Sequence, residues 1–203
     1  MFTLSQSQGE YLVRLARRVI EAELNDEPTP HVKDVDDNLM TETGVFVTLN
    51  TVSPEGKRLR GCIGYPYPVK PLVEAVMDSA HNAAFEDPRF PPVRKEEAKD
   101  IVIEVSVLTP PEALNVDPSK LPDAVKVGRD GLIIGRGFKR GLLLPQVPVE
   151  WGWNSEEFLY QTCVKAGLPG DSWLLKGTEV MAFQAIIYSE RSPKGDIRLH
   201  TIS

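Results

Sequence analysis

The order in which two hydrophobic periodicities follow one another restricts the fold of this chain more than any other feature. Runs in which every second residue is apolar are typical of half-buried strands, and runs that repeat every three to four residues are typical of amphipathic helices. Along the chain they predict a helix, a β-hairpin, a helix, a strand, a β-meander, a helix and a strand. Because strand–helix–strand units do not recur, we expect an α+β domain with a mainly antiparallel sheet and flanking helices.

Three helices are predicted from capping signals and apolar stripes. They span residues 8–24, 71–85 and 155–166. The first begins at a capping box formed by Ser7 and Glu10, and its polar face includes Arg17. Pro71 suits the first position of the second helix, because a missing N–H group has no consequence there.

Alternating and β-branched segments, bounded by turn residues, predict the strands. These segments are residues 45–49, 58–64, 101–108, 125–127, 131–134, 141–144 and 179–188. The first two form a hairpin, and the three short segments between residues 125 and 144 form a meander. Residues 25–43 are rich in Asp, Asn and Pro and predict a flexible connector. We expect one domain over residues 1–203, with a smaller lobe built from the middle of the chain.

Composition excludes several classes of protein. At 41% hydrophobic and 26% charged residues, the 203-residue chain has the balance of a globular protein and is long enough to bury its own core. A formal net charge of −6 repels phosphate backbones, so the protein alone is not expected to bind nucleic acid. The absence of a long apolar run, of an export signal and of paired cysteines leads us to expect a cytoplasmic protein that does not enter a membrane.

Cys62 is the first candidate for chemistry, because it lies between Gly61 and Gly64, where missing side chains leave room for a ligand or another backbone. In an extended strand Arg60 shares its face, with Cα atoms about 6.6 Å apart, so the guanidinium would favour the thiolate. The alternative is that Cys62 is a small buried apolar residue. Cys163 lies on the apolar stripe of a predicted helix, where a core role is expected.

Four further residues are candidates for ligand binding. Asp87 and Arg89 lie in a proline-rich loop over residues 87–92, where Arg89 either binds an anionic group or closes a local pair with Asp87. Glu104 and Ser106 share a strand face that either lines a pocket or is exposed.

A general base for Cys62 is not evident from the sequence. The histidines are His31, His81 and His200, and only His81 lies in a well-formed predicted element, on the polar face of a helix. No Cys/His cluster, HExxH motif or iron–sulfur spacing is present, so we expect neither a metal nor a cofactor.

The hexapeptide at residues 59–64, Leu-Arg-Gly-Cys-Ile-Gly, resembles the hallmark of the AMMECR family, which is named for a human chromosomal region. The resemblance runs from the first helix to about Phe183. It includes residues 46–48, 87–92, 105–108, 144–146 and 152–153. It implies an α+β fold of two unequal lobes with a cleft between them, at which the matching residues gather.

Two functions fit this resemblance. In the first, the protein is an enzyme or enzyme component in which Cys62 is a nucleophile activated by Arg60, while Asp87, Arg89 and Ser106 bind the substrate. In the second, it is a non-catalytic module that binds a small molecule or a protein partner in the cleft. The resemblance also implies Memo-like and radical-SAM proteins as partners in a pathway that modifies a nucleic acid or a small molecule.

Overall fold

The computed structural model describes residues 3–32 and 35–200, and the chain divides into two compact units. The first unit contains the chain up to Leu108 together with Ile186–His200, and the second contains Thr109–Ala185. Each unit packs helices against antiparallel strands, which confirms the predicted α+β class. Among the described residues no helix is both long and apolar enough to cross a membrane.

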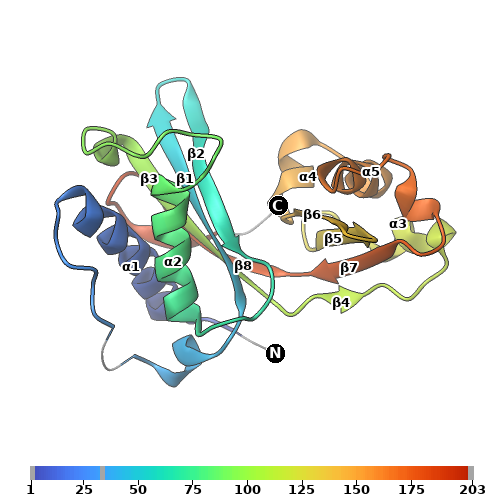
Figure 1. Cartoon of the computed structure of the whole chain (residues 1–203), viewed down its shortest axis with the longest axis horizontal. Coiled ribbons are helices and arrows are strands. Elements are labelled where there is room, and N and C mark those ends of the chain that lie inside the picture. The colour runs from blue at the N-terminus through green and yellow to red at the C-terminus, as the bar shows by residue number, and fades with distance from the viewer. Residues whose placement is uncertain (1–2, 33–34, 201–203) are drawn as a thin grey trace. The chain divides into compact units, whose positions relative to one another are not determined.

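The first unit is a five-stranded sheet in the order β2-β1-β3-β8-β9. Its strands are β1 (Gly44–Ser53), β2 (Gly56–Tyr65), β3 (Ile101–Leu108), β8 (Ala185–Glu190) and β9 (Ile197–His200). Helices α1 (Gln6–Leu24) and α2 (Leu72–Phe85) both lie on one face of this sheet (Figure 1). The predicted hairpin is confirmed as β1 and β2, and the strand predicted over residues 101–108 is β3.

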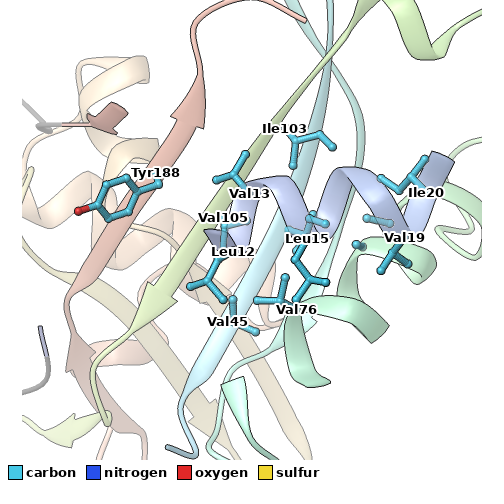
Figure 2. Close-up of a cluster of buried hydrophobic side chains, with 14 of the residues drawn as sticks. Leu12, Val13, Leu15, Val19, Ile20, Val45, Val76, Ile103, Val105 and Tyr188 are labelled. Carbon is cyan, nitrogen blue, oxygen red and sulfur yellow. The ribbon is translucent and has the colours of Figure 1, made fainter. Parts of the chain in front are cut away.

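The core of the first unit lies between the two helices and that face of the sheet. Val45, which is completely buried, projects from β1 toward Leu12 and Leu15 of α1 and Val76 of α2 (Figure 2). Successive side chains of a strand point to opposite faces, so the odd-numbered residues of β1 and β3 face the helices. The even-numbered residues of both strands therefore occupy the face that α1 and α2 do not cover.

The second unit is a four-stranded antiparallel sheet in the order β4-β7-β5-β6. Its strands are β4 (Glu112–Ala113), β5 (Gly131–Arg136), β6 (Lys139–Leu143) and β7 (Glu179–Phe183), and its helices are α3 (Leu121–Ala124), α4 (Gln146–Trp151) and α5 (Ser155–Lys165). Leu132 and Ile134 of β5 pack with Phe158 and Cys163 of α5 in a buried cluster. The prediction that Cys163 is a core residue is thus confirmed.

Two predicted strand assignments are wrong. Residues 125–127 do not form a strand, because the N–H of Lys126 donates to Oδ2 of Asp130 at 2.9 Å and closes a turn instead. The predicted strand over residues 179–188 is two strands in different sheets, β7 and β8. They separate at Gln184, whose N–H donates to the Thr109 hydroxyl at 2.8 Å.

The first turn of α1 also differs from the prediction. The capping box consists of Ser5 and Gln8, not Ser7 and Glu10, since the Ser5 hydroxyl accepts from the Gln8 N–H and the Gln8 side chain accepts from the Ser5 N–H. A Gln three residues after a Ser satisfies the same rule as a Glu, so the sequence offered two overlapping capping boxes.

The periodicity predicted Arg17 on the polar face of α1. This prediction is wrong, because Arg17 is buried in the interior. Its guanidinium makes two hydrogen bonds to the Glu190 carboxylate of β8, at 2.6 Å and 2.5 Å, and a third to the Ile101 carbonyl at 2.7 Å. Glu190 also accepts from the N–H of Ile103 at 3.0 Å. The pair therefore connects α1, β3 and β8 through charge-assisted hydrogen bonds between largely buried side chains.

We predict that Arg17→Met lowers the free energy of unfolding by about 3–5 kcal/mol, because it leaves the Glu190 carboxylate buried without a counter-charge. The double variant Arg17→Met/Glu190→Leu should recover most of that loss. Urea denaturation of the purified variants measures both effects. Arg18→Met is the matched control, since Arg18 is exposed and its replacement should change the free energy by less than about 0.5 kcal/mol. Equal effects of the Arg17 and Arg18 replacements would contradict the role given to the pair.

Candidate functional site

Cys62 lies on β2, an edge strand of the five-stranded sheet. Its register partner in β1 is Thr48, an even-numbered residue, so both side chains are on the face that α1 and α2 do not cover. The side chain of Cys62 is half-buried, and its sulfur accepts a hydrogen bond from the Thr48 hydroxyl at 3.3 Å. The thiol is thus held by a neighbouring donor on the face of the sheet that α1 and α2 do not cover.

The two glycines beside Cys62 make room for protein backbone. A Cβ atom on Gly61 would lie 2.0 Å from the Ala83 carbonyl oxygen of α2. One on Gly64 would lie 2.1 Å from the Val45 carbonyl oxygen and 2.7 Å from the Phe46 ring. The sequence suggested that these glycines leave room either for a ligand or for another backbone. In the structure the nearest atoms belong to the backbone of α2 and β1. They allow α2 and β1 to pack tightly on the strand that carries Cys62.

A row of polar side chains crosses the sheet from Cys62. Thr48 is paired with Cys62 on one side and with Glu104 of β3 on the other, so the three residues lie next to one another on one face. Nδ1 of His200, from β9, lies 3.9 Å from Oε2 of Glu104. We name the face that bears Cys62, Thr48, Glu104 and Ser106 the thiol face.

Ser106 occupies the next even-numbered position of β3, opposite Phe46. Its hydroxyl is fully buried and has no hydrogen-bond partner among the described residues. Buried hydroxyl groups in folded proteins are nearly always bonded to protein, to water or to a ligand. The thiol face therefore contains one polar group that the described protein atoms leave unsatisfied.

Asp87 and Arg89 are brought to Cys62 by the loop that follows α2. Asp87 Oδ2 accepts from the N–H of Cys62 at 2.9 Å, and Nη2 of Arg89 donates to the Cys62 carbonyl at 3.2 Å. The two side chains are joined by two hydrogen bonds, Nε to Oδ1 at 2.9 Å and Nη2 to Oδ2 at 2.7 Å. The outer edge of β2 is thus paired at Cys62 by a side-chain ion pair in place of another strand.

The contact between Asp87 and Arg89 shifts the pKa of each side chain so that both remain charged. The bonds from the Arg89 guanidinium, together with the N–H groups of Cys62 and Arg89, hold the pKa of Asp87 at about 2 although burial opposes the charge. The same contact raises the pKa of Arg89. Asp87 is therefore ionised throughout the neutral range.

Arg60 does not act on the thiol as expected. The register of β1 and β2 shifts between Leu49 and Asn50, which leaves Arg60 as the extra residue of a β-bulge and removes the simple alternation from Arg60 to Cys62. Its guanidinium instead bonds to the Glu97 carboxylate, at 3.0 Å and 3.1 Å, and to the Pro91 carbonyl at 2.9 Å. Arg60 thus supports the loop that carries Asp87 and Arg89.

The expected stabilisation of a thiolate by Arg60 is not found, since Arg60 is paired with Glu97. Burial raises the pKa of the Cys62 thiol, and Glu104 and Asp87 act in the same direction. The Thr48 hydroxyl and the Arg89 charge oppose this rise in pKa without overcoming it. The thiol is consequently protonated at neutral pH.

Sequence reasoning missed two residues of this site. Thr48 could have been identified from the hairpin register, which places an even-numbered β1 residue opposite Cys62. His200 could not, because β9 was not predicted from the sequence. His81 lies on α2, which covers the opposite face of the sheet, so the structure does not bring it to Cys62. Within the described part of the chain, no group of three or more His, Cys, Asp or Glu side chains is arranged to hold a metal.

Comparison with known proteins agrees with the hexapeptide at residues 59–64. A sequence model of the AMMECR1 family matches residues 13–188. Protein PH0010 of Pyrococcus horikoshii is 53% identical over 203 residues, covering 98% of this chain and 97% of that protein. Protein MJ0810 of Methanocaldococcus jannaschii is 48% identical over 198 residues, covering 97% of each chain.

The same relationship is seen in three dimensions. The crystal structure of the uncharacterized protein PH0010 from Pyrococcus horikoshii superimposes with a TM-score of 0.91 at 54% sequence identity, over 95% of this chain and 96% of that one. Sequence and fold thus agree over nearly the whole length. This chain belongs to the AMMECR1 family.

Proposed function

We propose that the protein is an enzyme or enzyme component that works through a ligand site on the thiol face, with Cys62 as its reactive group. The observation that carries this proposal is the clamp on Cys62. Its N–H and its carbonyl are both held by the Asp87–Arg89 pair, while its half-buried side chain lies beside a hydroxyl donor. Fixing both main-chain groups limits where the Cys62 side chain can lie, and a reactive group needs such a restriction.

A thiol with a raised pKa needs a proton acceptor before it can attack. Glu104 is the nearest carboxylate along the row, since it is the register partner of Thr48 on the same face. In the proposed step the sulfur forms a bond to an electrophilic carbon, the proton passes to Glu104, and the leaving group departs with its electron pair. The Thr48 hydroxyl, which already donates to the sulfur, stabilises the thiolate as it forms.

A second candidate function is a non-catalytic binding module. It is favoured by the protonated resting state of Cys62 and by the unsatisfied Ser106 hydroxyl, which a bound ligand would satisfy. In this function the thiol contributes shape and a weak hydrogen bond. The two functions differ in whether a reagent can reach the Cys62 sulfur of the folded protein and whether this sulfur can ionise. The rate of alkylation measures both properties.

We predict that iodoacetamide modifies Cys62 in the folded protein well before Cys163, because Cys62 is half-buried whereas Cys163 is fully buried. The rate should rise with pH to a midpoint above that of a free thiol. Thr48→Val removes the hydroxyl that stabilises the thiolate, so the rate at pH 8 should fall about tenfold. Peptide mass spectrometry after timed quenching measures both sites.

Cys62→Ser is the control for site assignment, and Cys163 is an internal control for unfolding. If neither cysteine is modified until the protein is denatured, Cys62 is a packing residue. The enzyme proposal then loses its nucleophile, and the binding module becomes the better account.

The Asp87 carboxylate gives a second prediction, on stability. Its folded pKa of about 2 lies below the unfolded value of 3.8, so its stabilising contribution is complete above about pH 4 and is lost as the pH falls toward 2. Asp87→Asn should therefore cost about 2 kcal/mol at neutral pH, and the difference from wild type should vanish between pH 4 and pH 2. Urea denaturation at a series of pH values measures it.

Asp100→Asn is the matched control, because Asp100 is exposed and its replacement should change stability by less than about 0.5 kcal/mol. A constant difference between wild type and Asp87→Asn down to pH 2 would show that the ion pair is not what stabilises the edge of β2.

A further inference from the structure

Arg89 is held in a geometry that leaves part of its guanidinium available. Nε and Nη2 are used by Asp87 and by the Cys62 carbonyl, whereas Nη1 makes no hydrogen bond to any described residue. The side chain is 46% exposed. The Phe90 ring, whose centroid is 5.4 Å from the guanidinium carbon, supports its flat face. Arg89 therefore presents a fixed donor beside the reactive residue.

The charge that a ligand meets at this pair is positive, although the pair as a whole is neutral. The Asp87 side chain is only 2% exposed, and each of its oxygens already accepts two hydrogen bonds. Its negative end is thus directed inward and saturated, and the accessible end consists of the N–H groups of Arg89. Arginine held in this way is well suited to a carboxylate or a phosphate oxygen.

From this geometry we infer that the ligand of the Cys62 site carries an anionic group, a carboxylate or a phosphate, which binds Nη1 of Arg89 next to its electrophilic carbon. This inference rests on the function proposed above and specifies its substrate class. The anion is confined to the outer edge of β2, because the Glu104 carboxylate lies on the opposite side of the thiol, across β1.

The test compares two alkylating reagents that differ only in charge, iodoacetate and iodoacetamide. With both, the Cys62 sulfur forms a bond to the methylene carbon, iodide leaves with the electron pair of the broken bond, and the thiol proton is released to solvent. For Cys62 in the folded protein, the rate with iodoacetate is divided by the rate with iodoacetamide. This ratio is then divided by the same ratio for Cys62 in the chain unfolded in urea, which gives the quotient. Thiol pKa cancels in this quotient, since both reagents need the same thiolate.

We expect a quotient of at least about ten, with saturation at increasing iodoacetate, because binding at Arg89 raises the local concentration of the anionic reagent. Arg89→Gln should bring the quotient close to one, and Arg89→Lys should give an intermediate value, since it keeps the charge but loses the fork of donors. Arg94→Gln is the matched control. Arg94 is exposed in the same loop and should leave the quotient unchanged.

The outcomes separate this inference from the function on which it rests. If iodoacetamide modifies native Cys62 but the quotient is near one, the anionic substrate class is overturned and the reactive thiol stands. A raised quotient that persists in Arg89→Gln overturns the assignment to Arg89. If neither reagent modifies Cys62 in the folded protein, the proposed function itself fails, and the inference with it.

Discussion

The hydrogen bond from the Cys62 N–H to the buried Asp87 carboxylate is the interaction on which the arrangement of the site depends. An edge strand ordinarily leaves backbone groups open to solvent, and β2 is such a strand. Asp87 closes that edge at one residue and in the same contact fixes Arg89, which in turn holds the Cys62 carbonyl. The Cys62 main chain, the Asp87 carboxylate and the Arg89 guanidinium thus hold one another in place.

The alternation of side chains along the strands determines which residues can lie beside Cys62. Helices α1 and α2 cover one face, so the apolar odd-numbered residues of β1 and β3 are committed to the core. The alternate residues must lie on the other face, and three consecutive strands bring Cys62, Thr48 and Glu104 into one row. The site is therefore a consequence of strand register, which pairs Thr48 with Glu104, 56 positions further along the chain.

The parts of the fold and of the site that depend on interactions between residues close in sequence could be predicted. The parts that depend on tertiary contacts could not. The hairpin, the strand over residues 101–108 and helices α1, α2 and α5 were predicted, because periodicity and turn residues act over a few positions. The short helices α3 and α4 were not predicted. Arg60 was misjudged because a β-bulge changes the direction of a side chain without a signature in the sequence. Arg17 was misjudged because its buried partner, Glu190, is 173 residues away. Asp87 and Arg89 were predicted as a local pair or an anion site, but their hold on the Cys62 backbone is a tertiary contact.

Under the proposed function, the raised pKa of the Cys62 thiol would confine its reactivity to the occupied site. Oxidation and metal capture both require the thiolate, so the burial that raises the thiol pKa also protects the half-buried sulfur from side reactions. The groups that favour the anion, the Thr48 hydroxyl and the Arg89 charge, are nevertheless already in contact or nearby. In the proposed reaction these donors would need no rearrangement when charge develops on the sulfur, so they would stabilise the reacting state more than the resting one, as a preorganised site does.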